Sequence, residues 1–395
     1  MSNVREVVVV SGVRTAIGDY GGSLKDLGAT ELGAVVVREA IARAKVDPGQ
    51  VTHGVLGNVI HGEAKDMYLS RVACVNGGMA HHSQALTVNR LCGSGLQAIV
   101  SAAQLVMLGD ADIAIGGGAE SMSRAAYAVP GARWGARMGD TSMIDMMVGA
   151  LTDPFDTVHM GVTAENVAEK WGLTREAQDE FAVESHRRAA AAIAEGRFKE
   201  QIVPVELKTR KGTTVFDTDE HVRTDASLEG MAKLRAVFKK DGTVTAGNAS
   251  GINDGAAAVV LAESSVAEKQ GLQPLGRLVS YGFAGVDPAY MGEGPIPAVQ
   301  TALKRAGLST ADLDVIESNE AFAAQALAVC KGLELDPART NPNGGAVALG
   351  HPVGATGAIL TVKALYELQR IGGRYALVTM CIGGGQGIAA VFERL

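Results

Sequence analysis

Two stretches of the chain share one order of small and apolar residues. The first begins at the glycine-rich turn Gly93 to Gly95, continues with apolar residues at helical spacing and ends at Gly109. The apolar run 111–115 follows and is predicted to form a buried strand. Residues 350–387 repeat the order of turn, helix and strand. The apolar positions of the two predicted helices are Leu96, Ile99, Val100, Ala103, Val106 and Met107 in the first, and Ile359, Leu360, Ala364, Leu365 and Leu368 in the second.

The repeat extends to further segments, which indicates two similar α/β halves joined near residue 270. Residues 5–12 (REVVVVSG) resemble 276–282 (GRLVSYG), and 51–60 (VTHGVLGNVI) resemble 313–322 (LDVIESNEAF). Three glycines close each repeated stretch, at 116–118 and at 383–385. The segment between Ser121 and about Asn248 has no counterpart and is interpreted as an insertion. The predicted domains are therefore an N-terminal half (1–120 with 249–270), a loop domain that covers the site (121–248) and a C-terminal half (271–395).

Composition restricts the class of protein. The 395 residues are 47% hydrophobic and 20% charged, which is typical of a globular chain, and 50 glycines with only 4% aromatic residues favour tight strand–helix turns. A net charge of −7 argues against general nucleic-acid binding. We expect no membrane span, because no uninterrupted apolar run approaches the roughly 20 residues that a span needs. The sequence also shows no export signal. We therefore expect a cytoplasmic protein with neither nucleic-acid nor membrane partners.

The four cysteines occur without CxxC or CxxH spacing, which argues against a disulfide framework and a zinc site. Cys74 and Cys330 are most simply core residues. Cys92 precedes the first predicted helix, where the unpaired N–H groups of a helix N-terminus favour a thiolate. It is therefore either core filler or a nucleophile, and its position alone does not separate the two.

Other reactive groups occupy matching turns of the two halves. His351 lies in the turn before the second predicted helix, Cys381 is expected to end the last strand, and Asn319 is expected to end an earlier strand. In a duplicated α/β fold, such strand ends and helix starts meet at one crevice. We therefore expect two thiols, an imidazole and an amide in one pocket, without a metal.

Four motifs, NRLCGSGLQA (89–98), NEAFAAQA (319–326), NGGAVALGHPVGATGA (343–358) and CIGGGQG (381–387), resemble the thiolase family over essentially the whole chain. The resemblance is strongest to its biosynthetic acetyl-CoA acetyltransferase and broad-chain β-ketothiolase members, including those of polyhydroxyalkanoate-making bacteria. It implies a five-layer αβαβα fold of two similar halves with an inserted loop domain. It also implies ping-pong Claisen condensation of two acyl-CoA molecules to 3-ketoacyl-CoA plus CoA, or the reverse; the alternative is a degradative 3-ketoacyl-CoA thiolase.

The resemblance also implies residue roles. Cys92 would carry the acyl group, His351 would shift its proton, and Cys381 would remove an α-proton from the second acetyl-CoA. His351 and a water held by Asn319 would stabilise the enolate, and the backbone N–H groups of Cys92 and Gly383 the tetrahedral intermediate. CoA and acyl-CoA would be substrates, with no prosthetic group. A homotetramer is implied, with residues 127–140 as a candidate contact loop.

The expected CoA contacts combine local charge with motif matches. Residues 208–240 contain eight basic and five acidic side chains, a local excess of positive charge that would suit a nucleotide or would simply be an exposed charged face. The resemblance favours CoA and implies Arg223 at the nucleotide and Ser250 at the pantetheine arm. The residues implied to line the pantetheine channel or the acyl pocket are Leu151, His159, Met160, Met291 and Phe322.

Three other classes fit the residues less well. A β-ketoacyl synthase would carry a histidine at the position of Asn319 and would lack Cys381. A non-catalytic acyl-CoA carrier has no use for two thiols with an imidazole. A thiol-redox protein would need the absent CxxC.

Overall fold

One hydrogen-bonded sheet passes through both halves of the computed structural model, which describes residues 5–209 and 212–395. Within the described residues this sheet has 11 strands, and its main path runs β13-β14-β15-β12-β1-β11-β5-β3-β4. The strands of the main sheet are β1 (Val7–Thr15), β2 (Gly18–Asp19), β3 (His53–Gly57), β4 (Gln84–Val88), β5 (Ile113–Ser121), β8 (Ile202–Val203), β11 (Asn253–Glu263), β12 (Gly276–Gly285), β13 (Val315–Ser318), β14 (Tyr375–Ile382) and β15 (Gln386–Glu393). The two halves are joined where β1 pairs with β12 through Val8–Arg277 and Val9–Gly276.

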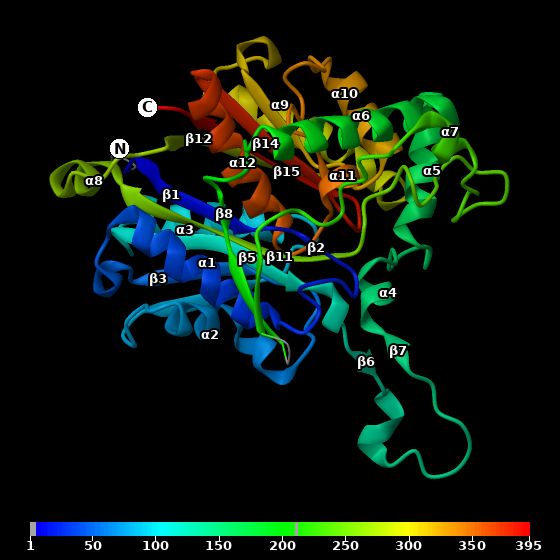
Figure 1. Ribbon diagram of the computed structural model, residues 1–395, viewed down its shortest axis with the longest axis horizontal. Helices are drawn as coiled ribbons and strands as arrows, with labels where there is room; N and C mark the ends of the chain where they lie inside the picture. Colours follow the sequence, from blue (N-terminus) through cyan, green and yellow to red (C-terminus); the bar gives the residue numbers. More distant parts are fainter. Residues whose placement is uncertain (1–4, 210–211) are drawn as a thin grey trace.

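Helices form three of the five layers, as Figure 1 shows in part. Helices α1 and α2 pack on the N-terminal half of the sheet, and α9 packs on the C-terminal half. Between them, α3 and α12 contact each other and strands of both halves. The N-terminal and C-terminal parts of the sheet are therefore the two strand layers, and the five-layer arrangement is confirmed. The helices are α1 (Ala29–Ala44), α2 (Leu69–Asn76), α3 (Ser94–Leu108), α4 (Met146–Ala150), α5 (Met160–Trp171), α6 (Arg175–Ala194), α7 (Leu228–Ala232), α8 (Ser264–Gln270), α9 (Pro295–Ala306), α10 (Ala323–Leu333), α11 (Ala346–Leu349) and α12 (Thr356–Ile371).

The repeated segments occupy matching places, with one exception. Both repeated turns lead into helices, α3 and α12, and each helix is followed by a buried strand, β5 or β14. The matched glycine triplets differ: Gly116 to Gly118 lie inside β5, whereas residues 383–385 form the turn between β14 and β15. In β5 an added Cβ at Gly118 would lie 2.1 Å from the Gly354 carbonyl oxygen. These glycines therefore permit close packing, whereas Gly384 and Gly385 have the positive φ of a tight turn.

Helix α3 requires a correction to the hydropathy analysis. Residues Leu91–Leu108 are long and apolar enough to meet the length and composition criterion for a membrane span. Within the described residues, however, α3 packs against β3, β5 and α12. The apolar residues of α3 thus have an explanation in the core, where Leu96, Ile99 and Ala103 are fully buried.

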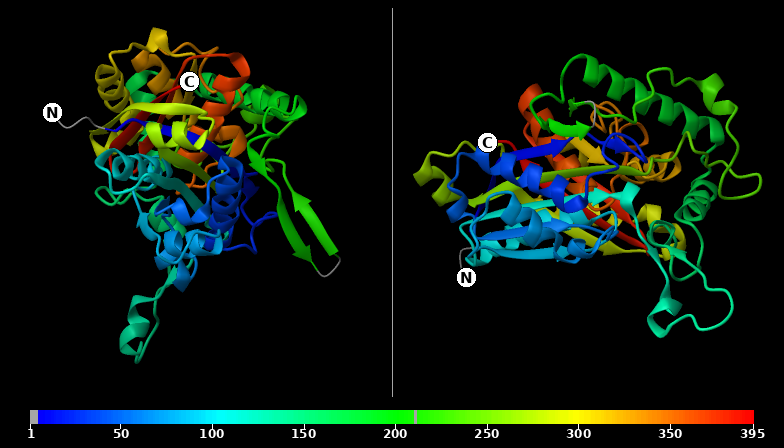
Figure 2. Two further views of the ribbon diagram at one scale, coloured as in Figure 1. Left: turned by 90° about the vertical axis from the view of Figure 1, so that its left-hand side faces the viewer. Right: turned by 60° about the horizontal axis from the view of Figure 1, so that its bottom comes forward.

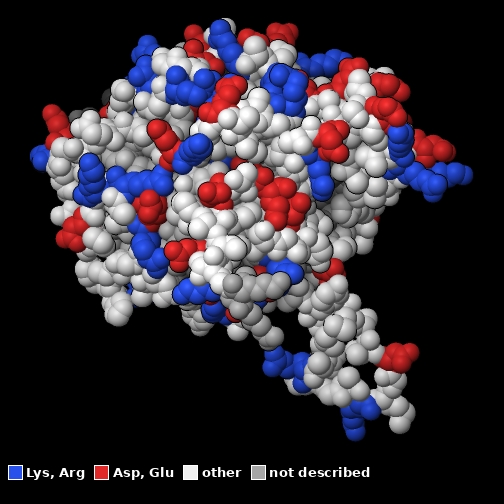
Figure 3. Space-filling model, in the orientation of Figure 1, with Lys and Arg blue, Asp and Glu red and all other residues white. Residues whose placement is uncertain are grey.

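The predicted loop domain contains helices α4 to α7 and two small sheets. Strands β6 (Tyr127–Ala128) and β7 (Ile144–Asp145) form the root of an arm, residues 126–146, which projects from the body in Figure 1 and has a largely uncharged surface in Figure 3. Strands β9 (Val205–Thr209) and β10 (Gly212–Phe216) form the hairpin that projects in Figure 2. Two of the eight basic residues counted between positions 208 and 240, Arg210 and Lys211, lie outside the residues that the structure describes. The predicted domain boundaries stay a prediction.

A buried ion pair ties the loop domain to the N-terminal half. The Arg14 guanidinium, in β1, donates to both carboxylate oxygens of Asp219 at 2.7 and 2.9 Å, and both side chains are fully buried. The Ile17 backbone N–H donates to the same carboxylate at 2.9 Å. Removing one partner of such a pair typically costs about 3–5 kcal/mol, because it leaves an uncompensated buried charge. The segment after the hairpin is therefore fixed against β1.

Candidate active site

An apolar cavity of about 350 Å³ lies where the two halves and the loop domain meet. Its wall includes residues from the turn before α3, the start of α5, the end of α4, the loop before β11, and the loops that carry His351 and Gly383. Nine of the residues expected at the site contribute to this wall: Cys92, Leu151, His159, Met160, Ser250, Met291, Phe322, His351 and Gly383. The structure thus brings together residues separated by up to about 290 positions in sequence.

Cys92 stands just before α3, between Leu91, whose φ is 44°, and the helix N-cap Gly93. Burial raises the pKa of the Cys92 thiol to about 11, although the backbone N–H groups of Gly383 and of Cys92 itself act to lower it. The sequence-based expectation of a favoured thiolate is therefore wrong for the free protein. Desolvation outweighs the N–H groups at the helix start, so Cys92 is a neutral thiol near pH 7 and needs a base.

His351 lies on the same cavity wall and has a ring nitrogen that can accept a proton. Its Nδ1 lies 2.6 Å from the Thr356 hydroxyl, and this hydroxyl donates its single hydrogen to the Pro352 carbonyl at 2.9 Å. The hydroxyl can therefore only accept from the imidazole, which assigns the proton of neutral His351 to Nδ1 and leaves a lone pair on Nε2. Burial lowers the pKa of His351 to about 4. The imidazole is consequently neutral near pH 7, with Nε2 free to accept a proton.

Asn319 and Cys381 do not contribute to the cavity wall and lie directly behind it. Asn319 follows β13, and its Nδ2 lies 3.4 Å from His351 Nε2. Its Oδ1 is buried and has no hydrogen-bond partner among the residues that the structure describes. Cys381 is fully buried and packs with the wall residues Met160 and Met291. Burial raises the pKa of Cys381 well above its usual value, and the nearby Cys92 raises it further.

The sequence suggested that Cys381 ends the last strand, but the structure places it elsewhere. It lies in β14, opposite Gly387 of β15, with the glycine turn between them. The apolar run after the three glycines is the continuation of a hairpin, which the positive φ values of Gly384 (78°) and Gly385 (83°) make possible. The turn brings the backbone of Gly383 to the cavity beside Cys92.

His159 both caps a helix and lines the cavity. Its Nδ1 accepts from the Gly161 backbone N–H at 3.0 Å and so caps α5. Its ring is stacked on Phe238, with centroids 4.6 Å apart and planes 13° apart. Phe238 in turn meets Phe322 edge-on at 6.1 Å. The three rings form an aromatic part of the cavity wall.

Arg223 is outside the cavity wall. Its side chain is 66% exposed, and its guanidinium lies 4.0 Å from the Asp19 carboxylate. His221, two residues earlier, packs against the wall residue Gly251, at which an added Cβ would lie 2.6 Å from the imidazole. Arg223 is therefore close to the rim of the cavity. Other basic residues of this segment form ion pairs elsewhere: Lys233 with Glu229 and Lys239 with Glu169.

The sequence analysis missed two features of the site. Glu120, at the end of β5, is fully buried and accepts from the Asn58 amide and from the backbone N–H groups of Val59, Ile60 and Gly354, at 2.9 to 3.1 Å. It thereby joins the loop that contains His351 to the other half, and burial raises its pKa to about 8. The sequence signal that could have identified Glu120 is a single acidic residue near the end of an otherwise apolar strand. Phe238 was missed because only the charges around it were weighed.

The raised pKa of Cys92 predicts how the free protein reacts with iodoacetamide. With a pKa of about 11, the thiolate fraction grows roughly tenfold per pH unit over the whole range from 7 to 10. Alkylation of Cys92, followed by mass spectrometry of its peptide, is therefore expected to accelerate throughout this range without a plateau. Cys74, with a pKa raised by burial to about 12, is the internal control. A plateau for Cys92 by pH 8 would contradict the neutral-thiol assignment.

The duplicated α/β fold, with a thiol and a neutral imidazole on one apolar cavity, defines an enzyme built for acyl transfer through cysteine. Family models agree: the thiolase N-terminal domain matches residues 7–265 and the thiolase C-terminal domain residues 272–394. The chain belongs to the thiolase family, and it is an acyltransferase.

Known relatives are similar over nearly their whole length. The chain is 69% identical to the beta-ketothiolase BktB of Cupriavidus necator, over 99% of this chain and 100% of that one. It is 49% identical to the acetyl-CoA acetyltransferase of Syntrophomonas wolfei over the same shares of the two chains. Among solved structures, human mitochondrial 3-ketoacyl-CoA thiolase in complex with CoA has a TM-score of 0.96 and 45% identity, covering 99% of this chain and 98% of that one.

Proposed function

We propose that the protein is a β-ketothiolase that joins two acyl-CoA molecules by a reversible Claisen condensation, releasing CoA and a 3-ketoacyl-CoA. The single observation that carries this proposal is the arrangement of Cys92 and His351 on one apolar cavity with the second thiol, Cys381, behind it. One thiol suffices to transfer an acyl group, but forming a carbon–carbon bond also needs a base for the α-proton. A second buried thiol beside the first supplies such a group.

The acylation half-reaction uses both thiols and the imidazole. His351 Nε2 takes the proton of Cys92, and the sulfur attacks the thioester carbonyl of the first acyl-CoA. The C–S bond to CoA then breaks, and Cys381 gives its proton to the departing CoA thiolate. CoA leaves as a thiol, and the enzyme holds an acyl-Cys92 thioester, a Cys381 thiolate and a protonated His351.

The condensation half-reaction returns these protons. The Cys381 thiolate takes an α-proton from the second acetyl-CoA, and the resulting carbanion attacks the carbonyl carbon of acyl-Cys92. The Cys92–acyl bond breaks, and His351 returns its proton to the Cys92 sulfur. At this stage Cys92 is an uncharged thioester and no longer the attacking thiolate, whose negative charge would raise the pKa of Cys381 further. Cys381 is therefore a better-stabilised thiolate in the half-reaction where it acts as a base.

Two groups of donors would stabilise the negative oxygens. Protonated His351 and the Asn319 amide, 3.4 Å apart, would face the enolate oxygen. The backbone N–H groups of Cys92 and Gly383, which both point at the Cys92 sulfur, would face the oxyanion of the tetrahedral intermediate. The unpartnered Oδ1 of Asn319 has room for a further donor, such as a water.

CoA would enter along the ring-lined side of the cavity. The pantetheine arm would pass His159, Phe238 and the Ser250 region, and the negatively charged nucleotide would remain at the rim near Arg223. The apolar lining suits the thin arm, and the exposed cation suits phosphates. Catalysis would need no prosthetic group, because all proton transfers use this chain's own side chains.

We also propose that the arm of residues 126–146 contacts a further copy of the chain, in a homotetramer. Its apolar side chains Trp134, Met138 and Met143 are 85%, 98% and 64% exposed, an exposure that is unfavourable on an isolated surface. A cytoplasmic location stays a prediction.

The acyl-chain range tests the proposed substrate class. Because Met160, Met291 and Phe322 form an apolar and adaptable wall, thiolysis of 3-ketoacyl-CoA substrates with four, five and six carbons is expected to give kcat/KM values within about tenfold of one another. Steady-state release of acyl-CoA would be measured for each. No thiolysis of any of the three would overturn the proposed function, and activity on four carbons alone would restrict it to acetoacetyl-CoA.

A further inference from the structure

A short flap, residues 235–246, forms one wall of the cavity. Its two segments run antiparallel: Ala236 bridges Thr245, and the Val237 N–H donates to the Val244 carbonyl at 3.0 Å. Its wall residues are Val237, Phe238, Thr245 and Ala246. The flap therefore presents the Phe238 ring that stacks on His159.

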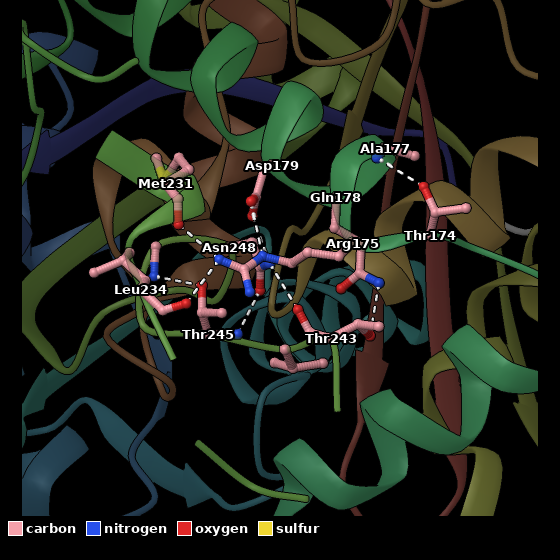
Figure 4. A network of polar contacts seen from close by, with 12 residues as sticks. Thr174, Arg175, Ala177, Gln178, Asp179, Met231, Leu234, Thr243, Thr245 and Asn248 are labelled. Atoms are coloured by element: carbon pink, nitrogen blue, oxygen red, sulfur yellow. Dashed lines mark hydrogen bonds and ion pairs between the residues drawn. The ribbon is translucent and has the colours of Figure 1, made fainter. Parts of the chain in front are cut away.

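The first end of the flap is held by Arg175, at the start of α6. Its Nη2 donates to the Met231 carbonyl at 2.6 Å and to the Leu234 carbonyl at 3.0 Å (Figure 4). These carbonyls lie at and just beyond the C-terminal end of α7. The last carbonyls of a helix have no N–H partner within the helix, and the negative end of the helix dipole favours a cation there. The chain enters the flap directly after Leu234.

The second end is held by the ion-pair partner of Arg175. Asp179 accepts from Arg175 Nε at 2.7 Å through one oxygen and from Asn248 Nδ2 at 2.9 Å through the other. Asn248 Oδ1 in turn accepts from the Thr245 backbone N–H at 2.8 Å. Asn248 is fully buried and the Asp179 side chain is only 6% exposed, so these bonds are shielded from water. One ion pair thus fixes both ends of the flap.

We propose that Arg175 and Asp179 are positioning residues that clamp the flap over the channel for the pantetheine arm of CoA. The inference rests on the proposed function for the identity of the bound chain. Neither residue contributes to the cavity wall, and both act through the backbone on which Phe238 and Thr245 stand. The clamp consequently governs CoA binding, whereas the groups that perform the chemistry lie on other elements.

Replacing Arg175 with methionine tests the clamp. Arg175→Met keeps an apolar stem but removes every donor, so KM for CoA in thiolysis is expected to rise on the order of tenfold, while kcat at saturating CoA stays within about threefold. Arg175→Lys is expected to raise KM less, because an ammonium cannot reproduce the forked contacts of a guanidinium. It is also the milder variant should Arg175→Met fold poorly.

Arg188, on the same helix, provides a matched control. Its Nε donates to Glu184 at 2.7 Å, and its Nη1 donates to the Pro337 and Thr340 carbonyls at 3.0 and 2.7 Å. The pattern repeats that of Arg175, but none of these partners contributes to the cavity wall. Arg188→Lys is therefore expected to keep the wild-type KM for CoA, even where it lowers thermal stability.

Trypsin cleavage provides a second readout that needs no turnover. Lys239 and Lys240 lie at the tip of the flap, and the Lys239 side chain is half exposed. Cleavage there, followed by mass spectrometry, is expected to be several times faster in the Arg175 variants than in wild type or Arg188→Lys, since loosened ends open the flap more often. An inactive wild type would refute the proposed function, and the cleavage assay would still test the clamp. Arg175 variants that melt earlier but keep wild-type KM and cleavage rates would overturn the inference.

Discussion

Cys381→Ala is expected to accept an acetyl group from acetyl-CoA but to form almost no acetoacetyl-CoA. The Cys92 sulfur, His351 and the backbone donors at Gly383 all remain in the variant, and the departing CoA thiolate can take from water the proton that Cys381 gives it in the wild type, so acylation is slowed but not abolished. Condensation also needs a base at the α-carbon of the second acetyl-CoA, and its rate is therefore expected to fall on the order of 10³-fold or more. Radiolabelled acetyl-CoA would give up to about one stable acetyl group per chain, located at Cys92 by peptide mapping.

Serine at position 381 is the control for shape. Cys381→Ser retains a similar volume in the buried cluster with Met160 and Met291, but its hydroxyl is far too weak an acid to move the proton. It is expected to behave like Cys381→Ala. Condensation at the wild-type rate in either variant, or a folded variant that does not acylate, would refute the division of work between the two thiols.

His351→Ala is expected to slow acylation itself by about 10²- to 10⁴-fold near pH 7. The Cys92 thiol, with its pKa of about 11, then lacks the neutral imidazole that accepts its proton. Raising the pH should restore part of the rate, since hydroxide ionises the thiol directly. The wild type needs no such help between pH 6 and 8, because the His351 pKa of about 4 keeps the imidazole neutral there. Single-turnover acylation across this pH range would measure both effects.

His159→Ala separates loss of the base from loss of an imidazole in the cavity. His159 also lines the wall, but its nitrogen caps α5 and its ring stacks on Phe238. Its removal is expected to raise KM for CoA and to leave acylation at saturating acetyl-CoA within about tenfold. If the two histidine variants lost acylation equally, His351 could not be assigned as the base.

The local parts of the site could be predicted from the sequence because they depend on neighbours along the chain. Apolar spacing predicted α3 and α12, and the glycine-rich turns before them placed Cys92 and His351 at helix starts. Asn319 does follow a strand, as expected. Cys381 was correctly placed near the end of a strand that precedes three glycines, but this strand, β14, is not the last one, because the glycines form a turn that leads into β15.

The amino-acid sequence alone determined the duplicated α/β architecture, the four motifs and the kinds of reactive side chain, because periodicity and turn chemistry are properties of short segments. The tertiary structure decided the protonation states of those side chains and the contacts that hold them in place. Burial reversed the expected pKa shift of Cys92, and the Thr356 hydroxyl fixed the proton of His351 on Nδ1. It also decided that Glu120 joins the two halves and that Arg175 holds both ends of the flap. These depend on desolvation and on hydrogen bonds between residues far apart in sequence, such as Glu120 and Gly354, and no local pattern of residues specifies them.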